Sequence, residues 1–213
     1  MDLSTIKNIA FELMGSKRSH EYKERGNKYY HGERVANLAV ELRKFILPND
    51  NSNDEIITVA AWYHDIMNGI DNHEKEGAVK TSEVLTPYCS SDELKKICEI
   101  IGVHDDRKPE IGNFPNYIKI HQDADLLDHF GTFEIWAAFL YTVWHNETVN
   151  DAADWLINGE LEEIKKYRGE LNFEISRSIY DEKTEFAKNF GERFKIEMSG
   201  RIWDKELFIQ NGK

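Results

Sequence analysis

The chain has 213 residues and a mass of 24.9 kDa, which suits one domain, and its 40% hydrophobic residues suffice for a sizeable core. Its 27 Lys and Arg residues are outnumbered by 39 Asp and Glu residues, giving a formal net charge of −12. This charge excludes broad, sequence-independent binding to nucleic-acid phosphates or anionic lipid. A small anionic substrate stays compatible with it, because a bound divalent cation can dominate the field of its own pocket.

The N-terminal sequence Met1–Lys7 lacks the basic start and apolar run of a secretory signal, so we expect a cytoplasmic protein. Cys89 and Cys98 can form neither a disulfide framework nor a four-thiolate zinc site, and both are predicted to be reduced thiols. The longest apolar run, Ile135–Trp144, is well short of the roughly 20 residues that span a bilayer. We therefore predict no membrane partner and a buried core helix at this run.

Apolar residues recur at intervals of three and four along most of the chain, which predicts helices. Most of the breaks between them are marked by the four prolines, Pro48, Pro87, Pro109 and Pro115. The first stripe precedes a polar turn at 48–53 that offers several N-caps for the following helix. The two stripes consist of Val35, Leu38, Ala39 and Leu42, and then of Ile56, Ile57, Ala60, Ala61 and Tyr63.

Five further helices are predicted downstream. One begins near Glu74, and another runs from about Ser91 to about Val103, at a Ser-Ser-Asp-Glu sequence with the spacing of a capping box. A long helix begins after Pro115 and runs toward Trp144, where Gly131 could interrupt or kink it. Two more helices lie within 151–199, with an apolar face formed by Ile175, Ile179, Phe186, Phe190 and Phe194.

No stretch alternates apolar and polar residues over the length of a strand, and no repeat or linker divides the sequence. The predicted fold class is therefore all-α, with one domain over residues 1–213. A local boundary is expected around Asn146–Asn150, followed by C-terminal helices at about 150–200. A homodimer stays open, although core packing is the favoured role of the C-terminal aromatic residues Tyr180, Phe186, Phe190, Phe194 and Trp203.

The pair His64-Asp65 follows the apolar run 59–63, which would carry both side chains toward the interior. Burying an imidazole and a carboxylate costs free energy unless each finds a partner. A divalent metal ion satisfies both, since imidazole nitrogen and carboxylate oxygen are common ligands of zinc, iron, manganese and nickel. A hydrogen bond between the two side chains at a helix end is the other interpretation of this pair alone.

Two other helical segments place charged residues on one face. His31 and Arg34 are three residues apart and therefore share a helix face. Asp125 and Asp128 share a face in the same way, whereas Asp123 points elsewhere. Because an alanine and leucines lie between these aspartates, the segment is not typical of a solvated acidic face.

The ordered set of His31, His64-Asp65 and Asp125 resembles the H…HD…D signature of the HD superfamily of metal-dependent phosphohydrolases. The surrounding sequences are similar too, namely His31-Gly-Glu-Arg-Val-Ala-Asn-Leu, Ala60-Ala-Trp-Tyr-His-Asp-Ile and Gln122-Asp-Ala-Asp-Leu-Leu-Asp-His-Phe-Gly. The resemblance spans roughly residues 20–145. It implies a single HD-domain-like helical bundle with a C-terminal helical extension.

The resemblance also implies a metal ion bound by His31, His64, Asp65 and Asp125. This divalent ion would be Mn, Mg, Zn, Ni or Fe, and a second metal ion is compatible with the family. The implied activity is hydrolysis of a small phosphate ester, a nucleotide or related metabolite, by a metal-activated water. Arg34 is expected to bind the phosphate oxygens of this substrate.

His73 and His104 resemble further family histidines that contact the substrate phosphate or hold a second metal ion. Some HD hydrolases have an acidic residue three positions after the motif aspartate, where this chain has Asn68, which cannot exchange a proton near neutral pH. We therefore expect the general acid or base to be one of His73, His104 and Asp128. His20, His129 and His145 are interpreted as ordinary histidines without a role in the site.

Two other functions stay open. With His73 and His104 added, six potential ligands could hold two irons, as in di-iron oxygenases of related fold, although the short spacing from Asp65 to His73 disfavours this. A non-catalytic module that binds a metal or a nucleotide is favoured by the missing acid at Asn68.

Overall fold

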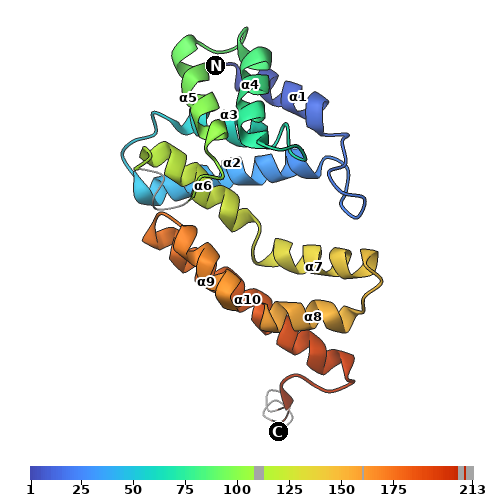
Figure 1. The fold of residues 1–213 in the computed structure, drawn as a ribbon. Helices are drawn as coiled ribbons and strands as arrows, with labels where there is room; N and C mark the ends of the chain where they lie inside the picture. The colour runs from blue at the N-terminus through green and yellow to red at the C-terminus, as the bar shows by residue number, and fades with distance from the viewer. Residues whose placement is uncertain (108–112, 160, 206–208, 210–213) are drawn as a thin grey trace. The chain divides into compact units, whose positions relative to one another are not determined.

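The computed structural model describes residues 1–107, 113–159, 161–205 and 209, and over these residues the chain forms helices and no strand (Figure 1). The predicted all-α fold class is confirmed. Pro109, predicted to separate two helices, lies outside the described residues.

The chain divides into two compact units, and the prediction of one domain over its whole length stays a prediction. The first unit comprises Met1–His129 and Tyr167–Ile179. It holds α1 (Leu3–Met14), α2 (Asn27–Ile46), α3 (Asp54–Tyr63), α4 (His73–Leu85), α5 (Ser91–Gly102) and α6 (Asn116–Asp128). The second unit holds α7 (Thr132–Trp144) and α8 (Val149–Asn158), while α9 (Leu161–Glu170) and α10 (Glu174–Met198) contribute residues to both units.

Helix α3 is the centre of the first unit and contacts α1, α2, α5 and α6. Its apolar residues 56, 57 and 59–63 are all buried, as the sequence predicts. The hydroxyl of Tyr63 donates a hydrogen bond of 2.9 Å to the carbonyl oxygen of Ile6 and so joins α3 to α1. Because α3 is buried along its length, the residues that follow its last turn, His64 and Asp65, are also carried into the interior.

Helix α2 packs against α3 and α6, and glycine allows a very close approach to α3. A Cβ atom on Gly32 would lie only 2.6 Å from the carbonyl oxygen of Ala61. At the C-terminal end of α2, the Arg43 guanidinium donates to both carboxylate oxygens of Asp54, with distances of 2.8 and 2.7 Å. The helices are thus held together at two points, and only the first requires a residue without a side chain.

We expect Gly32→Ala to lower the free energy of unfolding by about 1–3 kcal/mol, because the added methyl group must push α2 away from α3. Gly169→Ala is the matched control, since a Cβ atom there meets nothing within 4 Å. In a helix without a clash, this substitution is neutral or stabilises by up to about 1 kcal/mol. Urea unfolding of both variants measures the difference, and equal stabilities would contradict the close contact.

The prediction of one long helix from Pro115 toward Trp144 is wrong, because two helices, α6 and α7, occupy this range. The break includes Gly131, the residue predicted to interrupt the helix. Its φ of 78° and ψ of −129° are readily adopted only by glycine. Lys183 donates a hydrogen bond of 3.1 Å to the carbonyl oxygen of Phe130 at this break.

Two helices were predicted within 151–199, but the structure has three, α8, α9 and α10. Helix α9 ends before residues 171–173, and α10 begins after them. In this segment the backbone N–H groups of Asn172 and Phe173 donate to the carboxylate of Asp123, at 2.8 and 3.1 Å. These donors are therefore unavailable for a continuous helix. The predicted apolar face of α10 is correct except at Phe186, which is exposed.

The prediction that Ile135–Trp144 forms a buried helix is correct for the helix and wrong for the burial. Only Ala138 and Thr142 of α7 are buried, because α7 packs on one side, against α8 and the core around Ala152 and Ala187. Its other side is exposed, including Trp136, Tyr141, Val143 and Trp144.

Cys89 and Cys98 are both free cysteines, which confirms the predicted thiols. Among the helices that the structure describes, none has the length and apolar character needed to cross a membrane.

Glu134 in the first turn of α7 has a pKa that burial raises to about 7, although its carboxylate accepts a hydrogen bond from the Gly131 N–H at 3.1 Å. The folded state therefore binds more protons than the unfolded state between about pH 4.5 and pH 7. The stability that this group contributes at low pH is lost as the pH rises through 7.

We expect Glu134→Gln to remove this loss. We take the free energy of unfolding of the variant minus that of the wild-type protein. This difference should be about 1–2 kcal/mol larger at pH 8 than at pH 5, after allowance for solvent screening. Urea unfolding at the two pH values measures this. The same stability difference at both pH values would show that the Glu134 carboxyl titrates normally.

Candidate metal centre

Three buried histidines have their Nδ1 atoms directed at oxygens. His64 Nδ1 donates to the carbonyl oxygen of Ala61 at 2.8 Å, and His104 Nδ1 donates to that of Ile101 at 2.7 Å. His31 Nδ1 donates to Asp128 Oδ2 at 2.8 Å. Such hydrogen bonds fix the ring orientation and leave Nε2 as the atom that can bind an ion.

The Nε2 atoms face one another and two carboxylates. His31 Nε2 lies 3.2 Å from His64 Nε2 and 3.0 Å from Asp125 Oδ1. His64 Nε2 lies 3.5 Å from the same oxygen of Asp125 and 3.8 Å from Asp65 Oδ2. Two ligands of one ion cannot be farther apart than twice the metal–ligand distance, about 4.2 Å for nitrogen and oxygen ligands. Each of these separations meets this limit.

The four predicted ligands belong to two groups of side chains. Within each group, the ligand atoms lie within 4.8 Å of one another. One group is His31, His64 and Asp65, and the other is His31, Asp125 and His129. His31 belongs to both, and each of the four predicted ligands belongs to at least one of these groups. The chemistry of these donors fits a divalent transition-metal ion.

His31 also shows what an ion would replace. Burial alone would lower its pKa, but hydrogen bonds with Asp125 and Asp128 outweigh burial and raise the pKa of His31 to about 9. Its Nε2 atom therefore carries a proton near neutral pH and donates to Asp125. Since a metal ligand must be deprotonated, a bound ion would take the place of this proton.

Each metal-facing carboxylate has a cation on its second side. Lys28 Nζ lies 2.5 Å from Asp65 Oδ2, and Asn68 Nδ2 donates to Asp65 Oδ1 at 3.0 Å. Arg107 forms an ion pair with Asp125 Oδ2. Burial would raise the pKa of both carboxyls, but His64 and Lys28 lower it for Asp65, while Arg107 and His64 lower it for Asp125. Both side chains are therefore carboxylates, the form that binds metal.

Asp128, predicted as a proton-transfer residue, holds two other predicted residues in place. Besides its bond to His31, it accepts hydrogen bonds from Arg34 Nε at 2.9 Å and from Arg34 Nη2 at 2.8 Å. Arg34, predicted to bind phosphate, is 37% exposed and lies beside the centre with its guanidinium oriented by Asp128.

His73 and His104 lie on the other side of Asp65. Their Nε2 atoms are 3.3 Å apart, and His73 Nε2 is 4.0 Å from Asp65 Oδ1. These three residues form a further group that could hold an ion, and Asp65 is common to it and to the group of His31 and His64. Burial and the nearby His64 lower the pKa of His104, so its ring is neutral.

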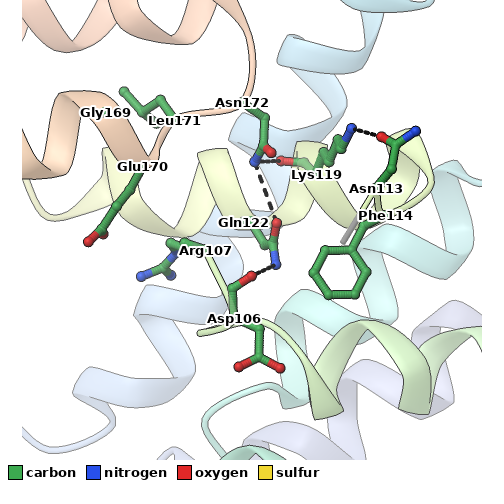
Figure 2. Close-up of a pocket in the computed structure, with 10 residues that line it drawn as sticks. All are labelled: Asp106, Arg107, Asn113, Phe114, Lys119, Gln122, Gly169, Glu170, Leu171 and Asn172. Carbon is green, nitrogen blue, oxygen red and sulfur yellow. Dashed lines mark hydrogen bonds between the residues drawn. The ribbon is translucent and has the colours of Figure 1, made fainter. Parts of the chain in front are cut away.

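A pocket of about 330 Å³ lies beside the centre, with Arg107 in its wall (Figure 2). Asn113 and Phe114, which precede α6, contribute to it, while residues 108–112 lie outside the described residues. Gln122 and Asn172 line the pocket from α6 and from the segment after α9, and Gln122 Nε2 donates to the carbonyl oxygens of Val103 and Asp106.

The sequence analysis missed Lys28, Asp105, His121 and Arg107, which lie at or near the centre, and it interpreted His129 as an ordinary histidine. Lys28 is three residues before His31, while His121 and His129 are each four residues from Asp125, so helix spacing could have identified them. Arg107 pairs with an aspartate 18 residues away, for which no local pattern exists. His121 is fully buried, and neither of its ring nitrogens has a hydrogen-bond partner among the described residues.

We expect Asp128→Asn to weaken metal binding about 10–100-fold, because the hydrogen bond that orients His31 loses its charge. Isothermal titration of the metal-free protein with Mn²⁺ measures this effect. Asp92→Asn, an exposed position on α5, is the control and should leave the affinity unchanged. Wild-type affinity in Asp128→Asn would show that His31 needs no charged partner to bind the ion.

Comparisons with known proteins agree on one fold. The HD domain family model matches residues 29–129. An HD-superfamily hydrolase from Bacillus thuringiensis is 22% identical, with a TM-score of 0.64, over 94% of this chain and 100% of that chain. Bacillus subtilis YpgQ in complex with ADP is 19% identical, with a TM-score of 0.62, over 91% of this chain and 93% of that chain. A predicted HD superfamily hydrolase from an uncultured Thermotogales bacterium is 22% identical, with a TM-score of 0.61, over 92% of each chain. No curated protein gave a significant match.

Proposed function

Since the HD domain family model matches residues 29–129 of this chain, we propose that it is a metal-dependent phosphohydrolase that acts on a nucleotide or another small phosphate ester. The family match confirms the resemblance inferred from the three sequence motifs, and the chain shares the fold of HD-superfamily hydrolases. The observation that carries the proposal is the convergence of His31 Nε2, His64 Nε2 and the Asp125 carboxylate within 3.5 Å of one another.

The charges around the centre support a phosphate substrate. The three carboxylates of Asp65, Asp125 and Asp128 are each paired with a cation, namely Lys28, Arg107 and Arg34. A divalent ion would add positive charge to this region, of which Asp105, the other carboxylate paired with Arg107, can offset only a part. A phosphate anion is suited to balance it, in agreement with the small anionic substrate that the acidic composition permits.

A bound divalent ion would lower the pKa of a water ligand and polarise a phosphoryl oxygen. The chain supplies the positions around it. Asn68 donates to Asp65 and transfers no proton, so proton transfer to the leaving group is assigned to His73, which is partly exposed, while the neutral ring of His104 could only accept a proton. Arg34 is proposed to bind the phosphate oxygens, and Asp128 is proposed to position Arg34 and His31.

A nucleotide is the substrate class we favour. The Bacillus subtilis relative YpgQ was crystallised in complex with ADP, and this chain has the same fold over nine-tenths of its length. The pocket beside Arg107 offers room for a part of the substrate that does not react, and the ring of Phe114 in its wall is a surface on which a base could stack.

Asp65→Ala should abolish metal binding and phosphate-ester hydrolysis together, while the helical circular dichroism spectrum stays nearly intact. The variant removes the carboxylate that His64, Lys28 and Asn68 surround. Elemental analysis and a screen of nucleotides and p-nitrophenyl phosphate measure the two losses. Asp71→Ala, in the exposed loop before α4, should behave as the wild-type protein. Hydrolysis that persists in Asp65→Ala would rule out the assignment.

A dinuclear centre is a second candidate, because Asp65 belongs both to the group of His31 and His64 and to the group of His73 and His104. Metal content per chain, measured on protein purified without chelator, separates the candidates. One non-iron divalent ion supports the mononuclear hydrolase. Two irons together with visible absorption would indicate a di-iron oxygenase, and bound metal without turnover of any phosphate ester would indicate a binding module.

A further inference from the structure

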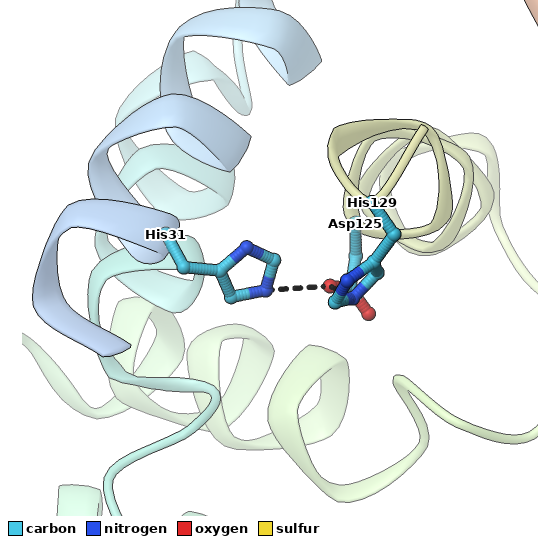
Figure 3. Close-up of side chains that lie close together, drawn as sticks. All are labelled: His31, Asp125 and His129. Carbon is cyan, nitrogen blue, oxygen red and sulfur yellow. Dashed lines mark hydrogen bonds and ion pairs between the residues drawn. The ribbon is translucent and has the colours of Figure 1, made fainter. Parts of the chain in front are cut away.

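His129 is placed beside the metal centre by the last turn of α6. It is the C-cap residue of this helix, still in helical conformation with φ of −74° and ψ of −16°, and its N–H donates to the carbonyl oxygen of Leu126 at 3.3 Å. It follows Asp125 by four residues, so both side chains project from one face of the helix toward His31 (Figure 3). Helix geometry therefore determines the position of this ring.

The distances suit a shared ion better than a direct contact. His129 Nε2 lies 3.9 Å from Asp125 Oδ1, the oxygen that His31 Nε2 approaches at 3.0 Å. The ring centroids of His129 and His31 are 5.0 Å apart. A separation of 3.9 Å is too long for a hydrogen bond, but it is within the limit of about 4.2 Å for two ligands of one ion.

The His129 ring is also the accessible one. Its side chain is 50% exposed, whereas that of His31 is 4% exposed. Among the described residues, no hydrogen bond occupies either ring nitrogen, unlike the Nδ1 atoms of His31, His64 and His104. An ion that enters from solvent would therefore meet a free imidazole nitrogen on this side.

We propose that His129 is a fifth protein ligand of the ion held by His31, His64, Asp65 and Asp125. The proposal rests on the metal centre of the proposed function. Three imidazoles and two carboxylates would leave one octahedral position, which either the water or a phosphoryl oxygen of the substrate would occupy. Because Mg²⁺ prefers oxygen ligands and keeps several waters, a third imidazole would favour a first-row transition metal such as Mn²⁺, Fe²⁺ or Ni²⁺ over Mg²⁺.

The test compares His129→Ala with His145→Ala, which removes the C-cap histidine of α7 and serves as the matched control. Isothermal titration of metal-free protein with Ni²⁺ should show affinity at least about 10-fold weaker in His129→Ala and unchanged in His145→Ala. The affinity for Mg²⁺ should change less than the affinity for Ni²⁺. Electron spin-echo modulation of protein loaded with one Cu²⁺ per chain should count one imidazole fewer in His129→Ala.

His31→Ala separates the possible failures. Loss of Ni²⁺ binding in His31→Ala but not in His129→Ala would overturn the fifth ligand and leave the metal centre standing. Full binding in both variants would overturn both proposals. Wild-type Ni²⁺ affinity in His129→Ala together with a raised KM for phosphate esters would make His129 a substrate contact, which also overturns its role as a ligand. His129→Gln, checked by circular dichroism, replaces His129→Ala if the latter does not fold.

Discussion

The candidate metal centre depends on the close approach of α2 to α3. One carbonyl group, that of Ala61, couples the two helices to the chemistry. It accepts the hydrogen bond that orients His64, and it is the group that any side chain on Gly32 would strike. Because Gly32 is next to His31, the contact that brings the backbones together also brings the two imidazoles to 3.2 Å. Packing and ligand geometry are therefore set by the same atoms.

The second constraint on the centre is the cost of burying its charges. Burying three carboxylates in one region would be strongly unfavourable if they were unpaired. Each has a cation within contact, and these cations come from α2 and from the segment after α5. The side chains of the candidate centre are thus already close together, and an ion would have to displace the proton on His31 Nε2. Because these side chains are already ordered, metal binding would cost little free energy for ordering them.

The sequence sufficed for the parts of this structure that depend on local pattern. Periodicity predicted the helices around Val35 and Ile56, because this signal lies within one helix each. Which residues meet was implied by the resemblance of the three motifs to a known family. The sequence failed where a distant partner decides. Asp123 captures the backbone of Asn172 and divides a helix 49 residues later, and Arg107 reaches Asp125 from a loop. The apolar sequence of α7 shows that it can be buried, but the neighbours available to it cover only one side.

The bond between Asp123 and Asn172 makes the first unit discontinuous in sequence, since residues 167–179 return to it after most of the second unit has been built. During synthesis, the segment that carries all the predicted metal ligands is complete at residue 129, yet the buried Asp123 carboxylate must wait for its donors until Asn172 and Phe173 emerge. Domains of many proteins fold in order from the N-terminus. Here the bonds of Asp123 can form only after the polypeptide has passed residue 173, so shortening the gene to the matched family region would remove the donors that this carboxylate has in the folded protein.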